Sequence, residues 1–212
     1  MKQADSAPWA IRAAAKAERE KQRKQLIKKL RLEFHQNESL WYSQRYAKEV
    51  GCSYEQYFPL WEVLCSWIGP QEQLLDLGCG IGEFAKFAIA RQKNYLLGVD
   101  FSDEAVRQAI INNPEQSDRF VIMDLYSPVL PEADVYLFSE VVEHLEHDLK
   151  ALADIVPVGK HTVISLPSFD CTSHYRFFKS KSQCEYRYSP LFDIRKIKRI
   201  GKFYALNCVR KA

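Results

Sequence analysis

Short apolar runs alternate with helical patterns after Gly69 and Pro70. Such alternation is typical of a parallel sheet wound with helices. We expect strands at 73–78, 95–100, 119–124, 133–139 and 161–166. We expect helices near 82–91, 102–112 and 140–156, because each begins beside an acid or Ser and ends near Asn, Pro or Gly. At the C-terminus, two further apolar segments meet at Gly201 and Lys202, which predicts a hairpin.

The first 69 residues have a different pattern. Residues 11–34 are rich in Ala, Lys, Glu, Gln and Arg, which predicts one long helix. Eight aromatic residues crowd residues 40–68, where one or two helices are expected, broken near Gly51 and Pro59. Such aromatics either pack against the main domain, which is the commoner role, or cover an active site. We therefore expect a helical extension or lid over 1–69 and one α/β domain over 70–212.

The net charge of +3 conceals an uneven distribution. Ten Lys or Arg face four acids in residues 1–35 and eleven face two in residues 176–212, whereas nine face twenty-one in residues 36–175. The basic ends are either solvated surfaces or a binding surface for an anionic substrate, such as a phosphorylated metabolite or RNA. The N-terminus holds no apolar run typical of a signal peptide, so we expect a cytoplasmic protein without membrane contact.

The strongest motif is LLDLGCGIGEF over residues 74–84, in which an apolar strand leads into Asp76 and then into three glycines at alternate positions. Glycines permit positive φ angles and let a ligand approach the bare backbone. Dinucleotide-binding folds use a different spacing, Gly-x-Gly-x-x-Gly, for a pyrophosphate. An acid two residues before Gly78 favours a ligand with a cationic amino group instead.

Two more acids end the following strands. Asp100 lies twenty-two residues after Gly78, at a position suited to accepting hydrogen bonds from ribose hydroxyls. Asp124 ends the next apolar run, where it would meet an adenine amino group between Met123 and Leu125. Each acid alone has a simpler interpretation as a helix cap. In this order, however, they indicate a nucleoside.

Residues 74–167 resemble the class I S-adenosylmethionine-dependent methyltransferases at LLDLGCGIGEF, GVDFSDEAV, MDL and FSEVVEHL. The resemblance implies a Rossmann-like, doubly wound, seven-stranded sheet that is mostly parallel, with an antiparallel C-terminal strand. It implies S-adenosylmethionine as cofactor. It also implies a set of cofactor-binding residues: Asp76, Gly78, Cys79, Gly80, Gly82, Asp100, Phe101, Met123, Asp124, Leu125 and Ser139.

The candidate catalytic residues follow the fourth and fifth strands. Glu140, Glu143, His144 and His147 would share one face of a helix through spacings of three and four residues. The interpretations are a general base, a divalent-metal site or a polar helix start, and we expect no metal. The loop after the fifth strand adds His174 as a base and Arg176 as a cation. We select His144, Glu143 and His174 as the catalytic candidates.

The same residues are similar to those of the small-RNA 3′-terminal 2′-O-methyltransferases at Glu140, Glu143 and His144. In that family these residues hold a metal together with a later histidine, for which His174 is the only candidate. The chain departs from that family because it lacks a dense run of histidines after the fifth strand.

Three hypotheses about function follow from the sequence. The first is methyl transfer to an oxygen or nitrogen atom of a small, phosphorylated or anionic acceptor. The second is an RNA methyltransferase, acting on the 2′-oxygen or a base, which binds RNA through the 11–34 helix and the basic residues Arg195, Lys196, Lys198 and Arg199. The third is a non-catalytic partner subunit that retains the fold.

Overall fold

The computed structural model describes residues 16–19, 21–22, 25, 38–48, 54–126 and 128–212. The chain divides into two units, residues 1–38 with 171–173 and residues 39–170 with 174–212. In the first unit, residues 16–19, 21–22 and 25 are helical, and the remainder of the helix predicted over 11–34 lies outside the described residues. The second unit contains the sheet and all the candidate site residues.

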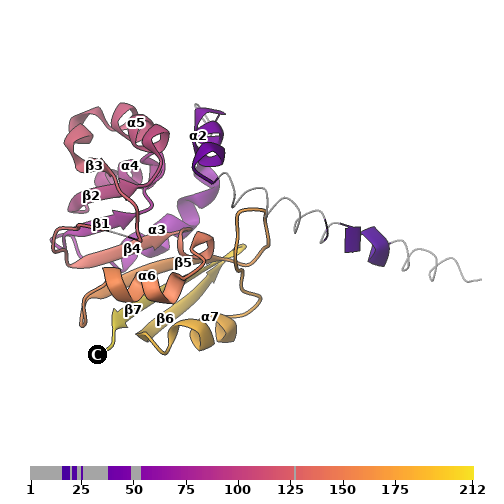
Figure 1. Cartoon of the computed structure of the whole chain (residues 1–212). Coiled ribbons are helices and arrows are strands. Elements are labelled where there is room, and N and C mark those ends of the chain that lie inside the picture. Colours follow the sequence, from indigo (N-terminus) through magenta and orange to yellow (C-terminus); the bar gives the residue numbers. More distant parts are fainter. Residues whose placement is uncertain (1–15, 20, 23–24, 26–37, 49–53, 127) are drawn as a thin grey trace, which may run out of the picture. The chain divides into compact units, whose positions relative to one another are not determined.

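The second unit is built on a seven-stranded sheet with the order β3-β2-β1-β4-β5-β7-β6 (Figure 1). Its strands are β1 Leu74–Leu77, β2 Tyr95–Asp100, β3 Phe120–Ile122, β4 Val135–Ser139, β5 His161–Pro167, β6 Phe192–Ile200 and β7 Phe203–Arg210. Neighbouring strands from β3 to β5 are parallel, whereas β7 is antiparallel to both β5 and β6. The predicted Rossmann-like sheet with an antiparallel last strand and the C-terminal hairpin are confirmed.

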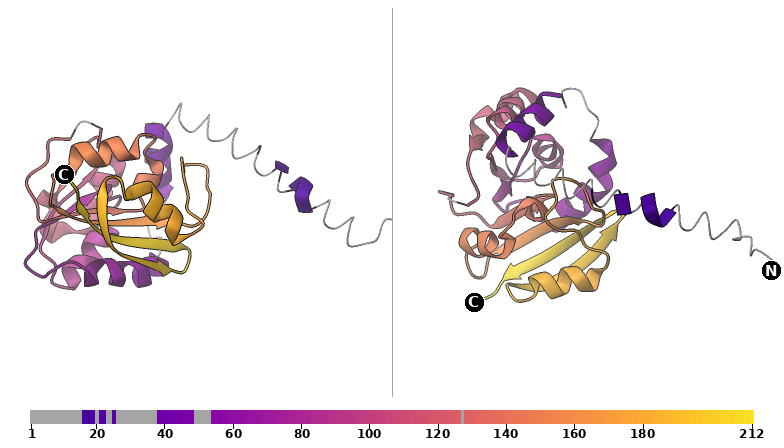
Figure 2. Two further views of the ribbon diagram at one scale, coloured as in Figure 1. Left: turned by 90° about the horizontal axis from the view of Figure 1, so that it is seen from below. Right: turned by 45° about the vertical axis from the view of Figure 1, so that its right-hand side comes forward.

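Helices cover both faces of this sheet, as the left view of Figure 2 shows for α6 and the helices opposite it. The helices are α2 Glu38–Lys48, η1 Glu55–Tyr57, α3 Phe58–Ser66, α4 Glu83–Ala90, α5 Asp103–Asn112, η2 Pro114–Arg119, η3 Val142–His144, α6 Asp148–Ile155 and α7 Lys181–Tyr188. Alternate strand residues pack into the two layers: Leu75 packs with Leu152 of α6, whereas Leu74 packs with Leu64 of α3. The central strands, such as β1 and β4, are therefore buried on both sides, as in doubly wound sheets.

The helix predicted over 140–156 forms only in its second half, as α6 Asp148–Ile155. Glu140 has a left-handed backbone with φ of 59°, the short η3 ends before an extended Leu145, and α6 begins only at Asp148. The guanidinium of Arg176 donates hydrogen bonds to the carbonyls of Val142, Leu145 and Glu146. A continuous helix would need these carbonyls for its own hydrogen bonds.

The helical face expected to hold Glu140, Glu143, His144 and His147 therefore does not form. His147 precedes α6 and is exposed, whereas Glu143 is fully buried. Of these four residues only Glu143 and His144 lie close together, with Oε1 and Nε2 3.8 Å apart. Glu140 is instead bonded to Ser165, and His147 is exposed.

Helix α7 has no counterpart among the predicted elements. It is short and polar, so its apolar periodicity is weak. Its start nevertheless has a capping signal in the sequence: the hydroxyl of Ser180 accepts from Gln183 N at 3.3 Å, and Gln183 Oε1 accepts from Lys179 N at 2.7 Å.

The division expected at residues 69 and 70 stays a proposal. Helix α3, which precedes it, contributes Leu60 and Trp61 to the core beneath β1. Pro59 lies in the first turn of α3 and so begins a helix instead of breaking one, whereas Gly51 lies outside the described residues. None of the described helices has the length and apolar character needed to cross a lipid bilayer.

Candidate functional site

The glycine turn joins β1 to α4 at the carboxyl ends of the parallel strands. The backbone N–H groups of Gly78 and Cys79 both donate to the carbonyl oxygen of Val99, at 2.8 Å and 2.9 Å. Val99 lies on the neighbouring β2, so the turn is fastened to the strand that also carries Asp100. Ligands of doubly wound sheets bind at this edge.

The three glycines of the turn all have positive φ, but they face different surroundings. A Cβ atom at Gly78 would lie 2.5 Å from Cγ2 of Val141, and one at Gly82 would lie 2.5 Å from Nδ2 of Asn113. At Gly80 the nearest atom would be Oη of Tyr46, at an ordinary 3.5 Å. Packing thus demands glycine at two of the positions, and only Gly80 has space above its backbone.

Asp100 ties the second strand to this turn. Its Oδ2 accepts from Gly80 N at 2.9 Å, and its Oδ1 accepts from Ser102 N at 3.0 Å. Burial raises the pKa of the carboxyl group, while the N–H groups of Ser102, Gly80 and Phe101 oppose this rise. The two carboxylate oxygens have four lone pairs between them, so three N–H donors leave room for one more hydrogen bond, as from a ribose hydroxyl.

Asp76 lies beneath the turn and is buried, with 1% of its surface exposed. Its Oδ2 accepts from the hydroxyl of Tyr95 at 3.0 Å, whereas Oδ1 has no partner among the described residues. Burial raises the pKa of Asp76 to about 7, and the Tyr95 hydrogen bond opposes this rise. The side chain therefore faces the interior of the sheet, and its attraction for a cofactor amine stays a prediction.

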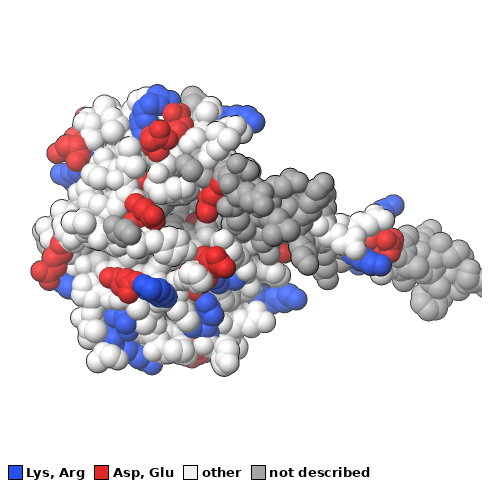
Figure 3. All heavy atoms as spheres, viewed as in Figure 1, with Lys and Arg blue, Asp and Glu red and all other residues white. Residues whose placement is uncertain are grey.

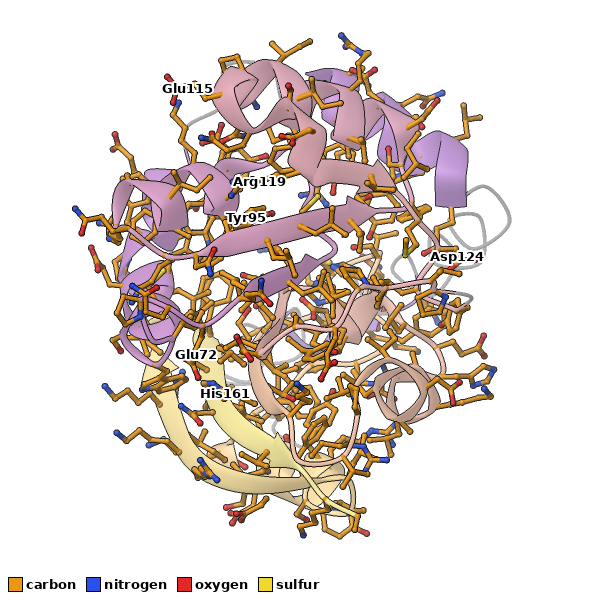
Figure 4. The ribbon with its side chains drawn as sticks, turned by 90° about the vertical axis from the view of Figure 1, so that its left-hand side faces the viewer. Glu72, Tyr95, Glu115, Arg119, Asp124 and His161 are labelled. Carbon is orange, nitrogen blue, oxygen red and sulfur yellow. The ribbon has the colours of Figure 1, made fainter. Side chains whose placement is uncertain are left out.

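The remaining predicted cofactor residues are divided between the surface and the core. Figure 4 shows Asp124 beyond the end toward which β2 points, where its carboxylate accepts from Tyr126 N at 2.9 Å. Met123 is half-buried and its N–H donates to the carbonyl of Asp100 at 2.8 Å. Leu125 is buried in the core, and Ser139 ends β4, half-buried and paired with Ser165.

Aromatic side chains of α2 lie over this edge of the sheet. The ring of Tyr42 is 5.2 Å from that of Phe101 and 6.1 Å from that of His144, measured between centroids. The carbonyl of Tyr46 accepts from Nε2 of Gln108 at 2.7 Å, which fastens α2 to α5. One aromatic residue thus contacts both the residue that follows β2 and a catalytic candidate.

The three catalytic candidates Glu143, His144 and His174 come together, although they belong to different segments. The N–H of Tyr175 donates to the carbonyl of Glu143 at 2.8 Å, which brings the loop after β5 onto η3. The rings of His144 and His174 are 4.9 Å apart between centroids, and Oε1 of Glu143 is 3.8 Å from Nε2 of His144. One nitrogen or oxygen atom from each residue lies within 4.8 Å of the others.

Arg176 has a different environment from the one its loop position suggested. Besides its bonds to three carbonyls, its Nη1 lies 3.4 Å from Oδ2 of the fully buried Asp148, at the start of α6. The same carboxylate accepts from Arg187 at 2.5 Å and from the hydroxyl of Tyr188 at 3.0 Å. Arg176 therefore supports the turn that carries His144.

Two further residues at this edge were not selected from the sequence. Ser165 of β5 accepts from Glu140 N at 2.8 Å and donates to Glu140 Oε1 at 2.8 Å. Burial raises the pKa of Glu140 to about 8, while this hydrogen bond and the charge of Lys202 oppose the rise. The left-handed backbone of Glu140 next to a strand end is the signal that only the structure supplies.

Comparison with known proteins supports this geometry. Residues 75–163 match the family model described as a methyltransferase domain. No match was found among curated proteins. The fold resembles that of 1,6-didemethyltoxoflavin-N1-methyltransferase from Burkholderia thailandensis, with bound 1,6-didemethyltoxoflavin and S-adenosylhomocysteine (TM-score 0.63, 14% identity, covering 100% of this chain and 94% of that one).

Two other solved structures have the same fold. The N-methyltransferase NodS of Bradyrhizobium japonicum, in complex with S-adenosylhomocysteine, gives a TM-score of 0.61 at 14% identity, covering 81% of this chain and 99% of that one. A putative methyltransferase of Haloferax volcanii, in complex with the Trm112 methyltransferase activator, gives a TM-score of 0.68 at 11% identity, covering 81% and 98%.

Proposed function

We propose that this chain transfers the methyl group of S-adenosylmethionine to an oxygen or nitrogen atom of a small acceptor, because residues 75–163 match the family model of a methyltransferase domain. The observation that carries the proposal is the position of Tyr42, which contacts both His144 and Phe101, the residue that follows β2. One side chain thus links the segment proposed to bind the nucleoside to the residues proposed to receive the acceptor.

Methyl transfer from a sulfonium requires the protein mainly to align the acceptor with the cofactor. A sulfonium already activates its methyl group, so the enzyme has to bring the acceptor atom in line with the sulfur–carbon bond and exclude water. Gly80 and Asp100 would hold the methionine and ribose parts, and Phe101 would lie against the adenine. Glu143, His144 and His174 would orient the acceptor and assist the departure of its proton.

An anionic or phosphorylated acceptor is favoured by Lys202, a cation at this edge of the sheet. Strand β6 runs parallel to β5, so the turn of the hairpin, with Lys202, lies at the same edge of the sheet as Glu140. The ammonium of Lys202 is 4.9 Å from the ring centroid of Phe169. Its positive charge also acts to lower the pKa of Glu140. Figure 3 shows most Lys and Arg side chains of one face in its lower part and acidic side chains near its centre.

RNA remains the alternative acceptor. The basic residues of β6 are exposed, which an RNA surface requires. They do not share one face, however, because Lys198 lies over the ring of Trp67 on the α3 side while Arg199 lies over Tyr204 on the other side. RNA binding through this strand would weaken steeply with salt, and an affinity that does not change with salt would contradict it.

The decisive experiment supplies the purified chain with methyl-labelled S-adenosylmethionine and with separate pools of small metabolites and RNA. Label in the metabolite pool supports the proposal, and label confined to RNA supports the alternative. Calorimetry on the same sample tests cofactor binding directly. Absence of binding would favour the third hypothesis, a non-catalytic partner subunit. The cytoplasmic location expected from the sequence stays a prediction.

In the same assay, His144→Ala should lower turnover far more than cofactor affinity, since we propose that His144 contacts the acceptor and not the cofactor. Replacement of the exposed His147 by Ala is the matched control, and it should change neither quantity. Equal losses of turnover and cofactor affinity in the His144 variant would assign this residue to structure.

A further inference from the structure

Two asparagines stand at the end of α5, the helix that follows β2. Pro114 comes directly after Asn112 and Asn113, and a proline disfavours helical backbone in the residue before it, so α5 ends at Asn112. Asn113 accordingly has φ of −131° and ψ of 65°. Asn112 is half-buried, and Asn113 has only 4% of its surface exposed. Buried amides need hydrogen-bond partners, and both side chains find them in the glycine turn.

Both amides donate to carbonyl oxygens where the glycine turn leads into α4. Nδ2 of Asn112 donates to the carbonyl of Ile81 at 2.9 Å. Nδ2 of Asn113 donates to the carbonyls of Gly82 at 3.1 Å and Ala109 at 3.0 Å. Both protons of the Asn113 amide are thus in use, so its nitrogen and not its oxygen faces the turn. A Cβ at residue 82 would lie 2.5 Å from this nitrogen, which explains why that residue is glycine.

These hydrogen bonds fix two consecutive peptide planes of the turn. The carbonyl of Ile81 shares a planar unit with the N–H of Gly82, which donates to the carbonyl of Cys79 at 3.1 Å. The carbonyl of Gly82 shares the next unit with the N–H of Glu83, the first residue of α4. A turn with glycines at alternate positions has much backbone freedom when nothing restrains it. The asparagines remove this freedom at the end of the turn that enters α4.

Gly80 lies between two sets of anchors. On the side of β1, the carbonyl of Val99 accepts from the turn, and the carboxylate of Asp100 accepts from Gly80 N at 2.9 Å. On the side of α4, Asn112 and Asn113 donate to the turn. All of these anchors belong to one continuous segment, from the end of β2 to the end of α5. The backbone of Gly80, which has space above it, is therefore held from both sides.

We propose that Asn112 and Asn113 are positioning residues for the cofactor, which hold the glycine turn in the conformation that receives the amino-acid part of S-adenosylmethionine. The inference rests on the proposed function, in which Gly80 holds that part of the cofactor. A backbone that is ordered in advance binds its ligand without a further loss of conformational entropy. Loss of either amide should therefore weaken the binding of the amino-acid part and leave the contacts of adenine and ribose in place.

The alternative role for Asn113 is a cap that stabilises α5 alone, because its amide also donates to Ala109 within that helix. Loss of such a cap would weaken the binding of every part of the cofactor equally, through the stability of the fold. Asn112 separates the two roles. Among the described residues, its amide donates to the turn and to no carbonyl of α5.

The test compares two nucleosides that share the adenosine and the thioether sulfur. S-adenosylhomocysteine carries the amino-acid part, whereas 5′-methylthioadenosine carries a methyl group in its place. Calorimetry with the full-length chain and with Asn112→Ala gives both dissociation constants. We expect the constant for S-adenosylhomocysteine to rise roughly 3- to 10-fold, as for one lost hydrogen bond, and that for methylthioadenosine to change by less than about twofold. Asn112→Asp keeps the shape but loses the donor, so it should bind no better than Asn112→Ala.

Asn113→Ala tests the second residue. It should show the same selective loss together with a lower stability in urea, because its amide also supports Ala109. If this buried substitution prevents folding, the half-buried Asn112 decides. Ile111→Ala is the matched control, because Ile111 lies in the same turn of α5 and is 60% exposed. It should change neither dissociation constant.

The outcomes separate this inference from the proposed function. Equal losses for both nucleosides in the Asn112 variants, or no loss for either, would overturn the inference and leave the asparagines a role in folding alone. The proposed function survives these outcomes, because the unaltered chain still binds S-adenosylhomocysteine. If the unaltered chain binds neither nucleoside, the proposed function fails, and the inference fails with it.

Discussion

The N–H of Gly80 donates a hydrogen bond to Oδ2 of Asp100 at 2.9 Å, across twenty positions of the sequence. This bond couples the bend after β1 to the end of β2. The carboxylate proposed to hold the ribose thus also fixes the backbone proposed to hold the methionine part.

Substitution of Asp100 by Asn should therefore weaken S-adenosylmethionine binding by more than one lost ribose contact. Hydrogen bonds to charged groups contribute about 1.5–3 kcal/mol, so we expect the dissociation constant to rise roughly 10- to 100-fold. Calorimetry measures this change. Asp103→Asn, on the exposed first turn of α5, is the control, and equal affinities in the two variants would show that Asp100 takes no part.

The three glycines of the turn should respond differently to substitution. Gly80→Val should abolish cofactor binding at a strain cost of about 1–2 kcal/mol in stability, because among the described residues an added Cβ would lie nearest to Tyr46, at an ordinary contact distance of 3.5 Å. Gly82→Ala should destabilise the fold by about 2–4 kcal/mol, because its Cβ would clash with Asn113. Urea unfolding and calorimetry distinguish the two effects. A Gly80 variant that retains full affinity would show that the turn is not the cofactor site.

Loss of Arg176 should impair both stability and turnover. Arg176→Met removes the donor to three carbonyls and one partner of the buried Asp148, which should cost about 3–5 kcal/mol. Arg107→Met removes an exposed ion pair on α5 and should leave the melting temperature unchanged. Cofactor affinity should persist in Arg176→Met protein that remains folded, since the glycine turn is supported separately. A variant with normal turnover would refute this supporting role.

Stability should fall as the pH rises toward neutrality, because of Asp76. Burial raises its pKa from 3.8 to about 7, so the folded chain retains a proton that the unfolded chain releases between these values. The associated stability is complete below pH 3.8 and is lost as pH rises through about 7. Asp76→Asn should remove this dependence, which is on the order of 4 kcal/mol. Urea unfolding at pH 5 and pH 8 measures it, and identical slopes in both proteins would contradict the expectation.

Strand positions were predictable because burial on both faces gives β1, β4 and β5 continuous apolar runs. Strand β2 has the predicted bounds of residues 95–100. The glycine turn with positive φ angles and the position of Asp100 at the end of β2 were predictable as well. The structure of residues 140–147 could not be predicted, because a distant residue, Arg176, prevents the helix that the local pattern favours. Arg176 takes the carbonyls that a helix needs, and nothing local to that segment reveals it.

The contact between the rings of His144 and His174 likewise could not be predicted from the sequence. Both lay near the carboxyl ends of strands, which predicted proximity to a ligand but no contact between the rings. Their separation of 4.9 Å depends on the bond from Tyr175 N to Glu143 O, which the fold alone establishes. Local patterns thus predict the elements and their order, whereas the site depends on pairings between loops.

Two residues of the segment after β5 have different roles. His174 lies beside Glu143 and His144, and Arg176 donates a hydrogen bond to the turn that carries them. Exchanging this loop for that of another methyltransferase, in order to change acceptor preference, would therefore also remove the hydrogen bonds from Arg176 that support the turn with His144. A chimera should therefore take the turn after β4 and the loop after β5 from the same parent protein.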